Sequence, residues 1–414
     1  MSDTSLFPRF TLGPVRTALD DTPVVVLQGA RQVGKSTLLE MIAAEREVRV
    51  ITMDDLPTRR MAEDDPVAVV DLFPQGLLAI DEAQRAPGLI LPLKANVDRH
   101  RTPGRFLVTG SADLLRVKDV GDSLAGRAET VEMMPLSQGE LSRRDTPEDF
   151  VTWLLAGAEG RDFSRLLPGA VIHGGFPDAH LRSPQRVRSW FASYVGRLSD
   201  HDARELHDGG YAEQLAGLLT YLASLGQAEL VKANVARHLG VAESTVDGYL
   251  RLARTMRMIC QYPAWNRSLH RRVVRRPKAS LCDTGLAASL VGFTQAMAAS
   301  PGGREFYGLL VEQFVALELA KQRAWTATPY DLGHFRESDG LEVDLIVETV
   351  DRRLIAIEVK TTTTPTNKHW SPLGAFRERF PDYDVTGVLL HAGDFTATLH
   401  NWLHVLPITA LWEH

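Results

Sequence analysis

Short apolar runs, separated by more polar stretches, fill the first third of the chain. The runs at residues 24–27, 77–80 and 106–108 are continuous rather than alternating. Continuous runs of this length are typical of strands buried on both faces of a parallel sheet. A further strand is expected at residues 48–54 and a helix at residues 36–44, which carry Leu, Met and Ile. The pattern therefore predicts an α/β domain built on a parallel sheet.

The pattern changes in the middle of the chain. Residues 140–205 are expected to be mostly helical, with aromatic residues at helical spacing. Residues 227–252 predict a helix that ends at Gly240, a tight turn, and a second helix capped by Ser244. This order is typical of a helix-turn-helix.

The last part of the chain predicts a second α/β domain. An amphipathic helix is expected at residues 309–319, and strands at residues 341–347 and 354–360. Glu358 and Lys360 are two positions apart on the second of these strands, so they point to the same face of the sheet.

Length and composition limit the classes of protein that fit. At about 150 residues per domain, 414 residues suggest two or three domains. The net charge of −6 gives no global attraction to nucleic acid, so such a contact must be local. No apolar run has the roughly 18 residues of a membrane helix, and residues 1–10 are not typical of a signal peptide. The two cysteines make neither a disulfide framework nor a zinc site. We expect a cytoplasmic protein without membrane contact.

The clearest motif lies between the first strand and the first helix. It matches G-x-x-x-x-G-K-[ST] in the residues Gly29, Ala30, Arg31, Gln32, Val33, Gly34, Lys35, Ser36 and Thr37. The two glycines allow backbone N–H groups to approach phosphate closely, and the helix N-terminus attracts the anion. Lys35 would reach the β- and γ-phosphates, and Ser36 would ligate Mg²⁺. The sequence therefore predicts a site for ATP and Mg²⁺.

Polar residues follow three other predicted strands. Asp81 and Glu82 end the strand at 77–80, where Asp81 would hold Mg²⁺ and Glu82 would activate the attacking water. Ser111 ends another strand and would touch the γ-phosphate. Arg127 follows as a candidate arginine finger, acting in cis or from a neighbouring subunit, or as a surface arginine. The acids at residues 54–55 suit either a ligand site or a helix cap.

These motifs carry a resemblance to a known family. Residues 29–37, 80–87, 107–112 and 123–127 occur in the order found in the AAA+-type ATPase domain of a widespread prokaryotic family. Its members carry a C-terminal domain of long-undefined function. The resemblance also includes residues 173–177 and covers nearly the whole chain. It implies a sensor role for Ser111, an ATPase core at residues 1–140 and a helical lid at residues 141–208.

The helix-turn-helix suggests a winged helix at residues 209–280. Residues 256–265 and 273–281 would form the two strands of its wing. Between and within them is a basic cluster that would contact phosphates, made of Arg267, Arg271, Arg272, Arg275, Arg276 and Lys278. The second helix carries acids, which suits a protein–protein or interdomain module equally well.

Residues 281–414 resemble the PD-(D/E)-x-K nucleases of the restriction-endonuclease-like fold. Asp344 on one strand, and Glu358 with Lys360 on the next, match that pattern. Asp344 and Glu358 would bind Mg²⁺, Lys360 would assist hydrolysis, and Glu312 would complete the metal site. A structural strand pair, or an inactive copy of the fold, fits the same residues.

Two hypotheses follow for the function. The first is an ATP- and Mg²⁺-dependent ATPase that acts on nucleic acid, DNA more than RNA, through its nuclease-like domain. The second is an NTPase switch whose C-terminal domain binds nucleic acid or protein without cleavage. A homo-oligomer is expected if Arg127 acts between subunits.

Overall fold

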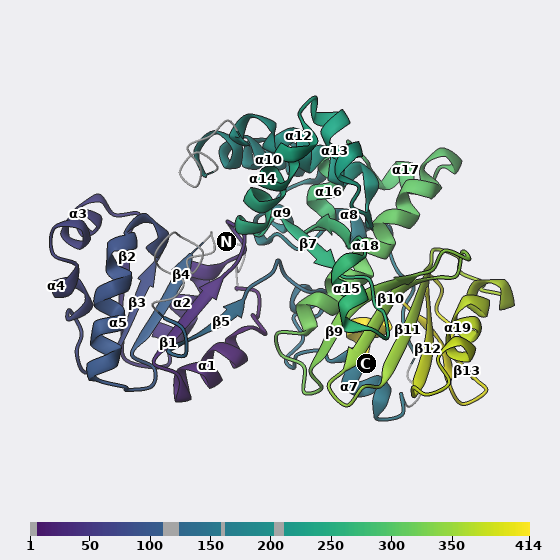
Figure 1. The fold of residues 1–414 in the computed structure, drawn as a ribbon, viewed down its shortest axis with the longest axis horizontal. Helices are drawn as coiled ribbons and strands as arrows, with labels where there is room; N and C mark the ends of the chain where they lie inside the picture. Colours follow the sequence, from purple (N-terminus) through teal and green to yellow (C-terminus); the bar gives the residue numbers. More distant parts are fainter. Residues whose placement is uncertain (1–5, 111–123, 159–161, 203–210) are drawn as a thin grey trace. The chain divides into compact units, whose positions relative to one another are not determined.

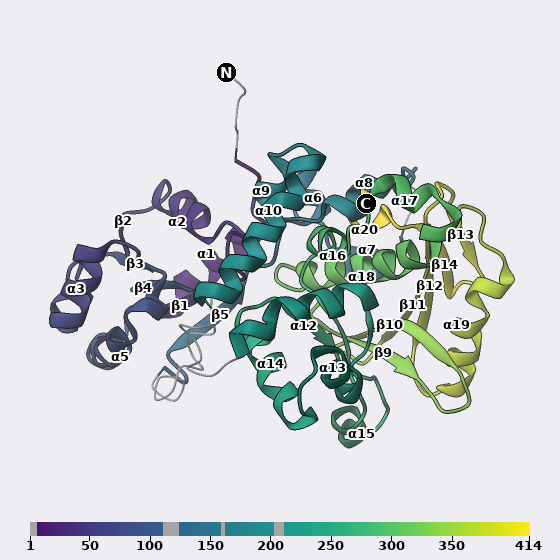
Figure 2. The ribbon, with the colours of Figure 1, turned by 90° about the horizontal axis from the view of Figure 1, so that it is seen from above.

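The computed structural model describes residues 6–110, 124–158, 162–202 and 211–414. The chain divides into two compact units. The first unit is Met1–Leu136 with Arg254–Met258, and the second is Ser137–Ala253 with Ile259–His414. Each is described separately below, and Figures 1 and 2 show the elements of both.

The first unit is built on a five-stranded parallel sheet. Its strands are β1 (Val24–Gln28), β2 (Val48–Thr52), β3 (Leu77–Asp81), β4 (Phe106–Gly110) and β5 (Ala128–Glu132). They lie in the order β2-β3-β4-β1-β5, and every neighbouring pair is parallel (Figure 1). The predicted parallel α/β domain is therefore confirmed. Strand β5 was not predicted, because its sequence contains no apolar run. It lies at the sheet edge, and most of its side chains are not buried.

Helices cover this sheet. They are α1 (Leu12–Asp21), α2 (Lys35–Ala43), α3 (Leu56–Asp64), α4 (Pro66–Val70) and α5 (Ile90–Arg99). One apolar core joins α3, α4 and α5 to strands β1, β3 and β4. Asp55 caps α3, because its carboxylate accepts the backbone N–H of Thr58 at 3.0 Å. Of the two alternatives for this acid, helix capping is therefore the one that the structure shows.

The second unit begins with a mostly helical part, as predicted. Its helices are α6 (Gln138–Leu141), α7 (Phe150–Leu155), α8 (Pro168–His173), α9 (Pro177–His180), α10 (Pro184–Arg197), α12 (Tyr211–Leu225), α16 (Thr284–Leu290) and α17 (Gln295–Ala299). Helices α8 and α10 pack on α16, and α6 and α7 pack on the C-terminal helix α20 (Ala410–Glu413). The helices of residues 141–202, which were expected to form a helical lid, therefore belong to the second unit, because they pack on other elements of that unit.

The segment His173–Gly174–Gly175 is fixed by a buried acid. The Asp283 carboxylate accepts the N–H of Gly175 at 2.6 Å and the N–H of Leu286 at 2.8 Å. A Cβ on Gly174 would lie 2.2 Å from Asp283 Oδ1, so glycine is required there. Burial raises the pKa of Asp283, while Lys321 opposes that shift. This motif therefore has a structural role in joining α8 to α16.

The helix-turn-helix is formed by α13 (Lys232–Leu239) and α14 (Glu243–Thr255). The first helix ends at Gly240, as predicted, and this glycine has the left-handed conformation with φ of 66°. Ser244 lies inside the first turn of α14 rather than before it, so its predicted capping role is wrong. Strands β6 (Ala228–Glu229), β7 (Ile259–Tyr262) and β8 (Lys278–Leu281) form a small antiparallel sheet in the order β6-β8-β7. Helix α15 (Leu269–Val274) separates β7 from β8, so the second wing strand is shorter than predicted.

A mixed six-stranded sheet forms the rest of this unit. Its strands are β9 (Tyr330–Arg336), β10 (Glu342–Thr349), β11 (Leu354–Lys360), β12 (Val385–His391), β13 (Ala397–Leu399) and β14 (Leu403–Pro407), in the order β13-β14-β12-β11-β10-β9. Strands β10 and β11 correspond to the two predicted strands, and they pair antiparallel as a hairpin. Helices α18 (Arg304–Gln322) and α19 (Asn367–Arg379) both pack on β11, with the sheet between them in Figure 2.

Helix α18 is the central element of the second unit. It is longer than the predicted amphipathic helix and buried over most of its surface. Its buried polar side chains bond to neighbouring backbone: Gln313 donates to Leu281 O at 2.9 Å, and Gln322 donates to Leu411 O at 2.7 Å. The Glu318 carboxylate accepts the N–H of Gln138 at 2.9 Å and pairs with Lys321 at 2.6 Å. Among the described helices, none combines the length and apolar character that a membrane crossing requires.

Candidate functional site

The predicted phosphate loop joins β1 to α2. Gly34 has φ of 99° and precedes Lys35, the first residue of α2. A Cβ on Gly29 would lie 2.2 Å from the carbonyl oxygen of Met133, so this glycine permits a close backbone contact. Behind the loop, the buried Arg9 guanidinium donates to Val33 O at 3.0 Å and to Met134 O at 2.8 Å. The sequence analysis did not identify Arg9, which lies far from the motif along the chain.

Lys35 lies inside the loop. Its ammonium donates to the carbonyl oxygens of Gly29 and Ala30, each at 3.1 Å, and its side chain is buried. The loop thus presents a cation at the start of a helix, where the helix dipole also favours an anion. The arrangement is suited to binding phosphate groups.

Ser36 and Asp81 meet at the same edge of the sheet. The Ser36 hydroxyl donates to Asp81 Oδ2 at 2.9 Å. Thr109, on the neighbouring strand β4, donates its hydroxyl to the other Asp81 oxygen. Parallel strands bring their carboxyl ends together, which is why residues from three separate segments meet here. Thr109 was missed as a site residue; a polar residue within an apolar strand is the signal that could have indicated it.

Glu82 follows Asp81 in a strained conformation. Its φ is 53°, in the left-handed region, and its N–H donates to Thr109 Oγ1 at 3.3 Å. The Gln84 side-chain amide donates to the Glu82 carboxylate. Glu82 is thus held at the edge where Ser36 and Asp81 lie.

Arg127 and Ser111 were also predicted to take part in the ATP site. Arg127 donates from Nε to Asp98 Oδ1 at 2.5 Å and from a terminal nitrogen to Ala125 O at 3.1 Å, both within its own unit. This hydrogen bond lowers the pKa of Asp98. Ser111 lies outside the described residues.

A second cluster of candidate residues lies on the mixed sheet. Lys360 places its ammonium 2.7 Å from Glu358 Oε2 and 3.6 Å from Asp344 Oδ2. Asp344 also accepts the N–H of Val359 at 2.9 Å. A single ammonium therefore pairs with both carboxylates. The predicted proximity of these three side chains is observed.

Strand β10 has an irregularity at Asp344, on the side that faces β9. Phe335 on β9 pairs with Val343, but Gly333 pairs with Ile346, so two residues of β10 face one residue of β9. Such a bulge redirects side chains and is frequent next to functional sites. On its other side β10 pairs regularly with β11, with Leu345 opposite Ile357, and this register brings Asp344 beside Glu358.

Glu312 is near this pair but has its own partner. Lys278 of β8 lies 2.8 Å from Glu312 Oε1 and 3.3 Å from Glu342 Oε1, and its side chain is only 5% exposed. Burial, and then the charge of Asp344, raise the pKa of both Glu312 and Glu358. Burial opposes the charged form of Lys360, but Asp344 and Glu358 outweigh it and raise its pKa. The cluster thus contains more carboxyl groups than ammonium groups, and the raised pKa values of Glu312 and Glu358 reflect both burial and this excess.

The arrangement differs from the predicted three-carboxylate metal site. In the described ranges, no group of three or more His, Cys, Asp or Glu side chains is arranged to hold a metal ion. Asp344 and Glu358 remain as a pair around one cation, a number of carboxylates that suffices for Mg²⁺.

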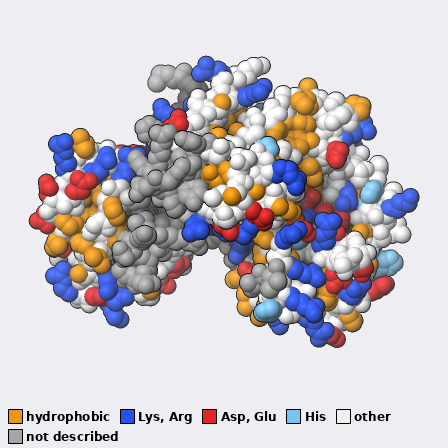
Figure 3. All heavy atoms as spheres, turned by 45° about the horizontal axis from the view of Figure 1, so that its top comes forward, with side chains coloured by type: hydrophobic (Ala, Val, Ile, Leu, Met, Phe, Trp, Pro, Cys, Tyr) orange, Lys and Arg blue, Asp and Glu red, His pale blue; other side chains and the backbone are white. Residues whose placement is uncertain are grey.

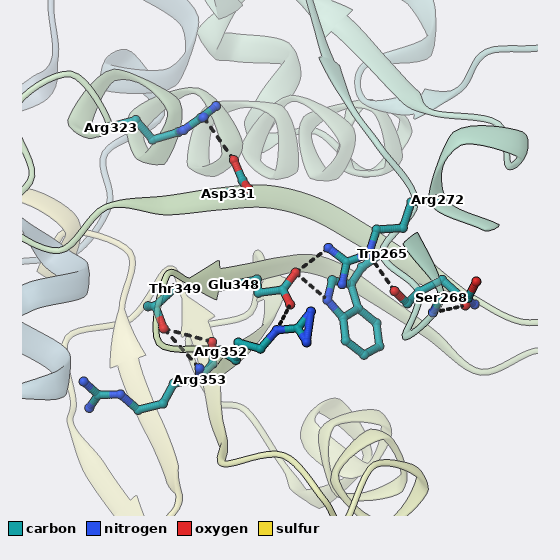
Figure 4. Close-up of polar contacts among 10 residues, drawn as sticks. Trp265, Ser268, Arg272, Arg323, Asp331, Glu348, Thr349, Arg352 and Arg353 are labelled. Carbon is teal, nitrogen blue, oxygen red and sulfur yellow. Dashed lines mark hydrogen bonds and ion pairs between the residues drawn. The ribbon is translucent and has the colours of Figure 1, made fainter. Parts of the chain in front are cut away.

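The predicted basic cluster is only partly at the surface. Lys278 is buried, and Arg272 bonds to Glu348 and to Asn266 O, with its guanidinium 5.3 Å from the centre of the Trp265 ring (Figure 4). Arg275 donates to Arg336 O at 2.7 Å. The prediction that all six cations face a ligand is therefore wrong for Lys278 and Arg272. Arg267, Arg271 and Arg276 are exposed, and Figure 3 shows Lys and Arg interspersed with Asp and Glu on the face in view.

The second helix of the helix-turn-helix has one of its acids paired with a lysine. Asp247 of α14 pairs with Lys232 of α13 at 2.8 Å, and both side chains are about half exposed. This pair reduces the negative charge of the helix surface without making it basic.

Comparison with known proteins identifies the family. The uncharacterized proteins Rv2008c of Mycobacterium tuberculosis and Mb2031c of Mycobacterium bovis are each 31% identical to this chain over 356 residues, covering 85% of it and 73% of each relative. This chain belongs to their family. Models of an AAA domain, of a domain of unknown function (DUF8612) and of another (DUF4143) match residues 21–142, 164–296 and 307–411.

The family assignment agrees with the geometry of the first unit. The AAA match includes the loop at residues 29–37, Asp81 and Glu82. The first unit is therefore an AAA-type ATPase domain, a kind of domain that binds and hydrolyses ATP. The DUF4143 match includes Glu312, Asp344, Glu358 and Lys360. Among solved structures, the Walker-type ATPase PABY2304 of Pyrococcus abyssi is 15% identical, covers 69% of this chain and 96% of its own, and has a TM-score of 0.43.

Proposed function

We propose that this protein is an Mg²⁺-dependent ATPase whose hydrolytic centre is formed by the loop at residues 29–37 and the ends of β3 and β4. The observation that carries this proposal is the 2.9 Å hydrogen bond from Ser36 to Asp81. A hydroxyl and a carboxylate that meet at a phosphate loop are the ligands that Mg²⁺ needs there. Ser36 and Asp81 would hold the ion, which neutralises phosphate charge when bound.

The other residues divide the remaining tasks. Lys35 and the backbone N–H groups of the loop would bind the phosphates. Glu82 would orient the attacking water and accept its proton. Thr109 bonds both to the Asp81 carboxylate and to the Glu82 backbone, so it would fix the positions of these two acids relative to each other.

ATP hydrolysis by the full chain tests this proposal. The wild type is expected to release phosphate from ATP with Mg²⁺ and not with EDTA. Lys35→Ala should weaken binding of a fluorescent ATP analogue by roughly tenfold or more, since it removes the ammonium that lies inside the loop. Equal binding and turnover in this variant would refute the proposed site.

An arginine finger acting between subunits is part of the same proposal. Arg127 is a partly exposed arginine that follows the strand carrying Thr109, and it pairs with Asp98. If it acts in trans, turnover per subunit should rise with protein concentration. Mixing Arg127→Ala with Lys35→Ala subunits should then restore some activity. Full activity in a strictly monomeric protein would contradict the role between subunits.

The second unit is proposed to act on nucleic acid, DNA more than RNA, through a winged helix and a nuclease-like domain. The support for contact is the exposed Arg267, Arg271 and Arg276 beside the helix-turn-helix. The support for cleavage is the Asp344–Glu358 pair around one cation. These two carboxylates would hold Mg²⁺, and Lys360 would stabilise the charge that develops on phosphate.

A non-cleaving switch is the second candidate. The observation that favours it is that the Lys360 ammonium already pairs with both carboxylates. The nuclease and the switch are distinguished by incubating the protein with a panel of DNA and RNA forms. The incubation contains Mg²⁺ or Mn²⁺, with and without ATP. Cleavage that Glu358→Ala abolishes, with ATP hydrolysis intact, supports the nuclease. Binding without cleavage supports the switch.

A further inference from the structure

Lys278 comes from a different part of the second unit than the carboxylates it contacts. It lies on β8, in the small sheet that follows the helix-turn-helix, whereas Glu312 lies on α18 and Glu342 on β10. Its ammonium is 2.8 Å from Glu312 Oε1 and 3.3 Å from Glu342 Oε1. A buried lysine is costly unless it is paired, so these contacts fix the end of the side chain.

Glu312 is close to the Asp344–Glu358 pair and yet does not join it. The carboxylate of Glu312 interacts electrostatically with both Asp344 and Glu358. Nevertheless, the described residues contain no group of three acids arranged for a metal. Glu312 differs from the pair in its cation: it is bound to the Lys278 ammonium, whereas Asp344 and Glu358 share the ammonium of Lys360.

Three other basic side chains lie near Lys278, and each pairs with a residue other than Glu312 or is neutral. Arg336 is half exposed and approaches Glu342 at 3.8 Å. Burial, and then Lys278, lower the pKa of His334 to about 4, so its imidazole is neutral at physiological pH. Lys360 pairs with Glu358 and Asp344.

We propose that Lys278 is a positioning residue that holds Glu312 apart from the Asp344–Glu358 pair. With Lys278 in place the centre has two carboxylates, and with Lys278 withdrawn Glu312 becomes the third. This inference rests on the proposed metal centre of the second unit. Because Lys278 belongs to β8, a ligand that shifts the small sheet also changes the number of carboxylates in the centre.

The test is Mn²⁺ binding, measured by titration calorimetry and by the electron paramagnetic resonance of free Mn²⁺. All proteins carry Asp81→Asn and are free of nucleotide, so that the centre in the second unit gives the signal. Lys278→Met should tighten Mn²⁺ binding by about tenfold or more, because ligand charge and number set the affinity. Lys278→Leu, which also lacks a donor for Glu312, provides a second variant in case Lys278→Met does not fold.

Two controls separate positioning from a general loss of positive charge. Adding Glu312→Gln to the Lys278 variant should remove the gain in affinity, because the third carboxylate is then absent. Arg336→Met removes a nearby cation that pairs with Glu229 and Glu342, and it should leave the affinity within about twofold of the parent.

Each outcome decides between the alternatives. Tighter binding that depends on Glu312 supports the inference. Unchanged binding in the Lys278 variants, or a gain that persists with Glu312→Gln, overturns it while leaving the metal centre in place. If the parent and every variant fail to bind Mn²⁺, both the proposed metal centre and the inference are wrong.

Discussion

The Ser36 hydroxyl donates a hydrogen bond of 2.9 Å to the carboxylate of Asp81. Ser36 is the second residue of α2, which follows β1 and the phosphate loop, and Asp81 ends β3, which lies two strands from β1 in the sheet. The contact shows that the fold brings the two predicted Mg²⁺ ligands together. The hydroxyl of Thr109, from the strand between, completes the contacts of Asp81.

Asp81→Asn tests the role of this contact directly. The amide keeps the shape and can still bond to Ser36, but it loses the charge that would hold Mg²⁺. We expect ATP hydrolysis to fall by about 100-fold, with a shift to higher Mg²⁺ concentration. Asp54→Asn is the matched control, because Asp54 follows the neighbouring strand β2 and pairs with Arg85 at 3.1 Å. An equal loss in both variants would contradict a specific role for Asp81.

Gly29→Ala should damage the loop itself. The added Cβ would lie 2.2 Å from Met133 O and 3.1 Å from a methyl group of Val33, so the backbone must move. Overpacking of this kind typically costs about 1–3 kcal/mol. We expect a lower melting temperature and weaker binding of a fluorescent ATP analogue. Gly13→Ala, where the Cβ meets nothing within 4 Å, should change neither.

A buried carboxyl in the second unit should make its stability depend on pH. Burial raises the pKa of Glu148 from 4.5 to about 8, and the carboxylates of Glu318 and Glu140 add to the shift. Between these values the folded protein holds a proton that the unfolded chain has lost. The free energy of unfolding should therefore fall as pH rises, by up to about 1.4 kcal/mol per pH unit, and level off above pH 8.

Tryptophan fluorescence during urea unfolding measures this effect in the second unit, because all seven tryptophans lie there. Glu148→Gln is neutral at every pH and should reduce the dependence between pH 6 and 8, leaving the part that comes from Glu312 and Glu358, whose pKa values are also raised. Glu378→Gln, on the exposed face of α19, should leave it unchanged. A pH dependence as steep in Glu148→Gln as in the wild type would contradict the role of Glu148.

DNA binding, if it uses the exposed arginines, should depend steeply on salt. Arg271→Ala with Arg276→Ala should reduce the slope of log affinity against log salt concentration by about 0.9 for each phosphate that is no longer neutralised. Arg352→Ala removes an exposed arginine on the β10–β11 turn and serves as the control. Arg272 is unsuitable for this test, because its bonds to Glu348 and Asn266 support the fold. An unchanged slope in the double variant would place the DNA-binding surface elsewhere.

Contiguous motifs allowed much of the first unit to be predicted. The loop at residues 29–37 and the acids that end β3 are read from neighbouring positions, and continuous apolar runs indicated three central strands. Strand β5 was not predicted, because an edge strand needs no apolar run. The contacts of Thr109 and Gln84 depend on how strands and turns meet in space, which local sequence does not specify.

Lys278 shows what local sequence leaves open in the second unit. Its place in a basic stretch indicated a surface cation, whereas it is buried against Glu312 and Glu342. Those partners lie on elements distant in the chain, so only tertiary packing reveals the pairing. Asp344, Glu358 and Lys360 were brought together as predicted, because a hairpin places its two strands side by side.

The most direct test of the proposed ATPase centre is single-turnover ATP hydrolysis by Glu82→Gln with Mg²⁺. The amide keeps the size of the side chain and its contact with Gln84 but cannot accept a proton from water. We predict that this variant binds ATP as tightly as the wild type and hydrolyses it about 10²- to 10⁴-fold more slowly. Hydrolysis at the wild-type rate would contradict the assignment of Glu82 as the base and the catalytic centre built around it.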